Sequence, residues 1–133
     1  MPAICLDYAK TKESKPYVFV KLKRLGKEFE TIFLVDSGAD YSIMTAELAE
    51  GLGIPLDRLP KKKIRGIGGM IELSSQDIRY EINGTEIAFD AKTFFGRDYK
   101  GGINLLGRKP LFSKARITFD DAKQQLTIEQ NAA

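Results

Sequence analysis

The residues best suited to chemistry lie in one short segment, Asp36-Ser37-Gly38-Ala39-Asp40. The segment directly follows an apolar run, TIFLV, which is expected to form a strand. A carboxylate, a hydroxyl and a glycine would therefore enter a tight turn beside buried apolar side chains. Burying a carboxylate in such a place is costly unless it is hydrogen-bonded or its pKa moves. Because Asp-Ser-Gly is also common in ordinary turns, the segment alone fits either a structural corner or an acid–base site.

Composition narrows the chemistry that this chain can perform. The 133 residues include no histidine and one cysteine, Cys5. This excludes Ser-His-Asp and Cys-His nucleophile chemistry, imidazole metal sites, thiolate zinc clusters and an intramolecular disulfide. Acid–base catalysis would have to come from Asp, Glu, Lys or Tyr. We expect no metal and no organic cofactor.

Charge and hydropathy favour a soluble protein without the strongly basic surface that is typical of nucleic-acid-binding proteins. The formal net charge is +3, and both signs are mixed along the chain. The densest basic run, Lys61-Lys62-Lys63 with Arg65 nearby, fits a solvated loop or strand edge, with an anionic contact as the alternative. No signal peptide and no apolar run near 18 residues is present, so we expect a cytoplasmic protein; a domain of a longer protein would look the same.

The elements that must position the Asp36 segment are short and mostly extended. A helix is predicted from the N-cap residue Thr45 to Gly51 or Gly53, and Pro110 would open one further helical turn. Strands are predicted over residues 17–22, 28–35, 63–65, 70–73, 77–82, 86–91, 103–106, 117–119 and 125–128. Seven to nine strands with one or two short helices indicate an all-β fold, a small closed or sandwich-like β domain.

Two later segments accompany the Asp36 segment in a fixed order. The first is a glycine-rich hairpin tip, Gly66-Ile67-Gly68-Gly69, and the second is Leu105-Leu106-Gly107-Arg108 before a short helix. Together the three segments resemble the retroviral-type (retropepsin) aspartic proteases over about residues 15–129. The resemblance implies one retropepsin-like domain over residues 1–133, folded as a closed β-barrel of the acid-protease type.

This resemblance implies an aspartic endopeptidase with Asp36 as its catalytic carboxylate. Two carboxylates that share one proton hold the attacking water in this family, the established chemistry of aspartic proteases. The chain has one Asp-Ser-Gly and no room for a second lobe. An active site would therefore need Asp36 from each chain of a homodimer, meeting on a two-fold axis. The partners expected are a second copy and an extended peptide or protein substrate, with no nucleic acid and no membrane segment.

The same resemblance assigns roles to the neighbouring residues. Ser37 would hold the geometry of the two carboxylates across the two-fold axis, and Gly38 would allow close approach of substrate. Asp40 and Arg108 would form an ion pair that braces the loop, the alternative being that Arg108 is a free surface charge. Other residues would meet the substrate: Ala39 in an apolar pocket, and Gly66, Ile67, Gly68 and Gly69 as a mobile flap. An ordinary hairpin is the alternative for the flap.

The chain departs from the family pattern at two places, and two functions other than proteolysis are considered. Lys109 stands where the family more often carries Asp or Asn, and the tail over residues 114–130 is longer than in compact viral enzymes, where terminal strands build the dimer. The first rival is a retropepsin-like peptide-binding or dimerisation module with little or no proteolysis. The second is an interaction barrel with an accidental Asp-Ser-Gly.

Overall fold

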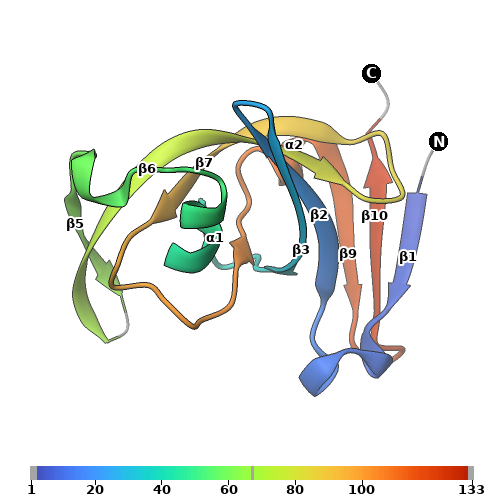
Figure 1. Cartoon of the computed structure of the whole chain (residues 1–133). Helices are drawn as coiled ribbons and strands as arrows, with labels where there is room; N and C mark the ends of the chain where they lie inside the picture. Colours follow the sequence, from blue (N-terminus) through green and yellow to red (C-terminus); the bar gives the residue numbers. More distant parts are fainter. Residues whose placement is uncertain (1–2, 67, 132–133) are drawn as a thin grey trace.

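The computed structural model describes residues 3–66 and 68–131, which form two sheets and a few short helices (Figure 1). The helical pieces are η1 (Tyr8–Lys10), η2 (Lys12–Ser14), α1 (Ala46–Gly51), η3 (Leu56–Arg58) and α2 (Leu111–Lys114). The strands are β1 (Ala3–Asp7), β2 (Tyr17–Arg24), β3 (Lys27–Val35), β4 (Ser42–Ile43), β5 (Lys62–Gly66), β6 (Gly69–Ile82), β7 (Ala88–Phe95), β8 (Leu105–Leu106), β9 (Ala115–Asp120) and β10 (Gln125–Gln130).

The larger sheet closes into a six-stranded barrel. Its strand order is β2-β3-β8-β4-β7-β6-β5, and an additional pairing of β2 with β6 completes the ring, leaving β5 outside it. A closed ring leaves few open edges, and its inward side chains alternate with outward ones along each strand. The mainly β fold class and the closed barrel expected from the sequence are confirmed.

The smaller sheet has the order β1-β10-β9 and stands beside the barrel, with both ends of the described chain at the same edge of the molecule (Figure 1). Ile4 and Leu6 of β1 pack against the barrel core, and Leu126 and Ile128 of β10 are fully buried. The two sheets therefore share one continuous apolar core.

Several predicted elements agree with the structure and a few differ. Thr45 caps α1 by accepting a hydrogen bond from the backbone N–H of Leu48, as expected. The ten strands of the described residues exceed the predicted seven to nine, partly because β1 was not predicted. The predicted strands at 70–73 and 77–82 are one strand, β6, and the return strand predicted at 86–91 lies later, at β7. Strand β6 stays continuous because it pairs with β5 over its first third and with β7 beyond it.

Candidate active site

The Asp36 loop begins where β3 ends, and β8 fixes its starting point. Leu34 and Val35 of β3 pair in parallel with Leu105 and Leu106. The backbone N–H of Asp36 then donates to the carbonyl of Leu106 at 3.0 Å. The Asp36 segment and the Leu105–Arg108 segment are therefore neighbours where the loop begins, although Asp36 and Leu106 are 70 residues apart in the chain.

Within the loop the carboxylate of Asp36 is held by its own backbone. The Gly38 N–H donates to Asp36 Oδ1 at 2.9 Å, and the Ala39 N–H donates to the Asp36 carbonyl at 3.3 Å. A side chain at Gly38 would place its Cβ 3.3 Å from that same Oδ1, so glycine leaves the carboxylate room. Asp36 is half-buried while Ser37 and Gly38 are exposed. The loop therefore presents a fixed carboxylate with one oxygen already bonded.

Gly107 and its two successors clamp the far side of the loop. The Gly107 N–H donates to Ser42 Oγ at 3.0 Å, and the Arg108 N–H donates to the Ala39 carbonyl at 2.8 Å. The Lys109 N–H donates to the Asp40 carbonyl at 2.9 Å. Arg108 and Lys109 brace the loop from backbone to backbone, and Gly107 binds the Ser42 hydroxyl beside it, so the loop geometry depends little on which side chains follow Gly107.

The predicted ion pair between Asp40 and Arg108 is wrong for this structure. Among the residues described here, no salt bridge joins the two, and both side chains are exposed. An ion pair between exposed groups gains little over hydration, whereas the backbone bonds already hold the two segments together. Arg108 supports the loop through its N–H, and its guanidinium is a surface charge, the alternative considered above.

A buried polar chain lies behind the loop. The hydroxyls of Tyr80 and Thr93 are 2.7 Å apart, and Thr93 Oγ1 donates to the Ala91 carbonyl at 3.0 Å. Burial raises the pKa of Tyr80, and hydrogen bonds with Thr93 and Ser42 partly offset that effect. Because Ser42 also accepts from Gly107, the chain connects β6, β7 and β4 to the loop clamp. Because each of these buried hydroxyls has a hydrogen-bond partner, the network fixes how the three strands pack against the loop.

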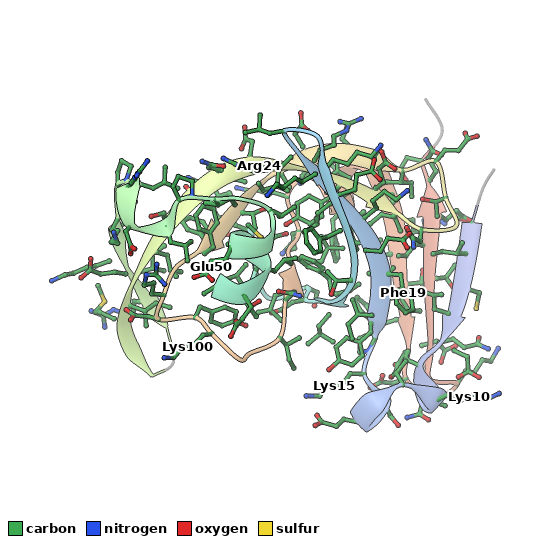
Figure 2. The ribbon with its side chains drawn as sticks, viewed as in Figure 1. Lys10, Lys15, Phe19, Arg24, Glu50 and Lys100 are labelled. Atoms are coloured by element: carbon green, nitrogen blue, oxygen red, sulfur yellow. The ribbon has the colours of Figure 1, made fainter. Side chains whose placement is uncertain are left out.

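A hollow of about 310 Å³ opens beside Asp36. Its walls come from the loop and the end of β3, at Leu34, Val35 and Ser37, and from parts of the chain that sequence reasoning did not connect with Asp36: Lys15, Pro16 and Phe119. Lys15 lies between η2 and β2 (Figure 2), and Phe119 belongs to β9 in the smaller sheet. No sequence signal marks these residues, because only the docking of the two sheets brings them to Asp36.

The predicted flap is the hairpin of β5 and β6, which projects from the barrel (Figure 1). Gly66 pairs with Gly69, and Ile67 lies outside the described residues. A Cβ at Gly68 or Gly69 would meet nothing within 4 Å, and Gly69 has φ of +117°, a conformation that glycine adopts readily. In the described part of the chain, no hydrogen bond joins the hairpin to residues 36–40. The hairpin tip is thus open on the sides that the structure describes.

Two further observations bear on what the site could hold. Among the described residues, no three His, Cys, Asp or Glu side chains gather closely enough to bind a metal ion. No helix in the same residues is long and apolar enough to cross a membrane.

The comparisons with known proteins agree with this geometry. The profile of the aspartyl protease family matches residues 20–89, which include the second part of β2, all of β3, the Asp36 loop and the hairpin. A crystal structure of a retropepsin-like aspartic protease from Rickettsia conorii superposes with a TM-score of 0.70 at 20% identity, covering 96% of this chain and 90% of that one. No curated protein sequence matches the chain. The chain therefore belongs to the aspartyl protease family and has the retropepsin-like fold.

Proposed function

We propose that the protein is an aspartic endopeptidase in which Asp36 helps to activate the water that attacks a peptide bond. One observation carries this proposal: Asp36 is held by a braced loop at the rim of an open hollow, with one carboxylate oxygen bonded to Gly38 and no cation paired with it among the described residues. A carboxylate that served only the turn would need no such access to solvent.

Peptide hydrolysis by carboxylates needs two of them, and this chain offers one at the loop. Asp40, the other acid of the motif, is exposed and is tied by its carbonyl to Lys109. We infer that Asp36 of a second copy supplies the missing group on a two-fold axis, with Ser37 beside it. One carboxylate takes a proton from water while the other donates its proton to the scissile carbonyl, so the pair keeps one proton in total.

The surroundings of Asp36 support a second copy at this face. Phe119 lines the same hollow and is 38% exposed. Phe19 and Ile32 are cross-strand partners on β2 and β3, and they are 60% and 41% exposed. Figure 2 shows Phe19 on the same strand that Lys15 precedes. Exposed apolar side chains on neighbouring strands favour burial against another protein surface.

The substrate would be an extended peptide lying between the Asp36 loop and the glycine-rich hairpin tip. Such a peptide adds as a strand, so backbone bonds give affinity and side-chain pockets give selectivity. Gly66, Gly68 and Gly69, with Ile67 between them, would let the hairpin close as a flap over the peptide. Ala39 and the apolar wall of the hollow favour apolar side chains beside the scissile bond.

Cleavage of a peptide library by the wild-type protein and by Asp36→Asn tests the mechanism. The substitution preserves shape and removes the ionisable group, so we expect cleavage to fall by at least about a thousandfold, in line with the removal of a group that acts as part of a catalytic unit. Asp90→Asn is the matched control, because Asp90 is an exposed carboxylate on β7 with one long ion pair to Arg79. Equal cleavage by wild type and Asp36→Asn would exclude the mechanism.

The dimer is tested separately. Sedimentation velocity should show a concentration-dependent dimer, and adding excess Asp36→Asn protein should inhibit the wild type by forming mixed dimers with one intact carboxylate. The rate should also pass through an optimum on the acid side of neutrality. A monomer that binds peptides without cleaving them would favour the peptide-binding module instead.

A further inference from the structure

A cationic cluster stands directly after the Asp36 loop. The ammonium groups of Lys92 and Lys109 lie 5.2 Å and 5.3 Å from the centroid of the Tyr41 ring. Lys92 also lies 5.3 Å from the Phe94 ring, which meets Tyr41 edge to face at 5.7 Å. Two positive charges are therefore gathered on one aromatic side chain that is 38% exposed.

The fold brings these residues together through rigid backbone. The Lys109 N–H is bonded to the carbonyl of Asp40, the residue before Tyr41. Lys92 precedes Thr93, whose register partner on β4 is Ser42, the residue after Tyr41. The Lys109 backbone is thus bonded to the residue before Tyr41, and Lys92 is one residue away from the pairing that involves the residue after Tyr41. The backbone that carries Tyr41, Lys92 and Lys109 is therefore fixed by the loop clamp and by the pairing of β4 with β7.

Within residues 3–66 and 68–131, neither lysine of the cluster forms an ion pair. Asp77 is the register partner of Lys92 on β6, yet no ion pair forms between them in the described residues, and Lys92 lies over Tyr41 instead. A hollow of about 360 Å³ next to Lys109 is lined by Arg108 as well, against the single acid Asp40. Lys92, Lys109 and Arg108 thus give this part of the surface three positive charges against one acid, so an added anion would be attracted to it.

We propose that Tyr41, Lys92 and Lys109 form a subsite for the carboxylate of an acidic substrate side chain. This inference rests on the proposed peptidase function and names its substrate class: peptides with apolar residues at the scissile bond and Asp or Glu further out. The aromatic ring would support the methylene groups of the acid while the two ammonium groups bind its oxygens. Because the proposed dimer carries two copies, each half of the bound peptide meets one subsite.

The test uses amidated, acetylated peptides, so that the only carboxylate comes from a side chain. At each position around a cleaved apolar pair, Glu is compared with Gln, both for cleavage by the wild type and for binding to Asp36→Asn by calorimetry. We expect Glu to be favoured about five- to tenfold at an outer position in both measurements, the size of two partly exposed ion pairs. The preference should shrink in high salt.

Variants assign the preference to the cluster. Lys92→Gln/Lys109→Gln should abolish it, and Lys92→Glu/Lys109→Glu should reverse it in favour of Lys at the same position. Lys114→Gln/Lys123→Gln removes the same charge from exposed lysines elsewhere and should leave it unchanged.

The outcomes separate the two proposals. Cleavage with equal use of Glu and Gln at every position, or a Glu preference that survives Lys92→Gln/Lys109→Gln, overturns the subsite and leaves the peptidase standing. If Glu peptides bind in a way that depends on the two lysines but are not cleaved, the peptidase proposal is overturned and the anion-binding cluster stands. Absence of both cleavage and binding overturns both.

Discussion

Gly107 lies so close to Tyr41 that a Cβ atom added to it would stand 2.4 Å from the Tyr41 carbonyl oxygen. The same Cβ would be 3.0 Å from the carbonyl of Ala39. Both contacts are to backbone atoms, which cannot swing away as the end of a side chain can. The glycine of the Leu-Leu-Gly-Arg motif is therefore fixed by the space behind the Asp36 loop.

Gly107→Ala should consequently destabilise the protein and displace the loop. We expect a loss of about 1–3 kcal/mol in the free energy of unfolding, the usual cost of overpacking a close contact, measured by urea denaturation. Peptide cleavage should fall further than stability alone explains, because the Asp36 carboxylate moves with the loop. Gly68→Ala is the stability control, since its Cβ would meet nothing within 4 Å. Similar stability losses for both variants would contradict the steric argument.

Ser42→Ala tests the buried hydroxyl that receives the Gly107 N–H. Ser42 is 1% exposed, so removing its Oγ leaves a buried donor without its partner. Such a change costs about 1–3 kcal/mol. Ser113→Ala removes an exposed hydroxyl from α2 that bonds only to a nearby carbonyl, so its effect should stay within about 0.5 kcal/mol. Thermal unfolding of both variants beside the wild type distinguishes the two sites.

The Arg97 ion pairs should make stability depend on pH. Arg97 Nε and Nη2 each lie 2.7 Å from an oxygen of Asp57, and Nη1 lies 3.1 Å from Glu50. The hydrogen bonds from Arg97 lower the pKa of Asp57. A lowered carboxyl pKa stabilises the folded state above the unfolded pKa of about 4, and this contribution is lost as pH falls through the folded value.

Arg97→Gln should therefore be less stable than the wild type at pH 7, and the difference should be smaller at pH 3, because part of the Asp57 contribution is lost as pH falls below the unfolded pKa towards the lowered folded one. Urea denaturation at the two pH values measures this difference. Arg58→Gln is the matched control, because Arg58 lines the same hollow as Arg97 without an ion pair among the described residues. A gap between wild type and Arg97→Gln that stays constant with pH would contradict the assignment to Asp57.

Local sequence patterns predicted the elements of this fold well where the cause is local. The Thr45 cap and the strands predicted at 77–82 and 125–128 depend on neighbouring residues, and the structure confirms them. Strand β1 was missed although Ile4 and Leu6 have the two-residue spacing of one face of a strand. Its pairing partner, β10, lies more than 100 residues away, and a short run near a terminus gives no sign of that partner.

The candidate site also has features that the sequence predicts and features that depend on contacts between distant parts of the chain. Three motifs in order indicated that Asp36 and Gly107 meet, and the backbone bonds bring them together. The walls of the hollow at Lys15 and Phe119 depend on how two sheets dock, which no spacing encodes. The Asp40–Arg108 pair failed because residue types alone do not say whether two exposed charges gain from pairing.

Strand β6 belongs both to the β5–β6 hairpin and to the barrel, so the hairpin can open locally only as far as the barrel begins. Residues up to Leu73 pair only with the outer strand β5, whereas from Ser74 the strand pairs with β7 and, towards its end, also with β2. Amide protons on one continuous strand should therefore fall into two kinetic classes in hydrogen–deuterium exchange. Those of the hairpin would exchange through fraying at the tip, and those beyond Ser74 only when the whole barrel unfolds.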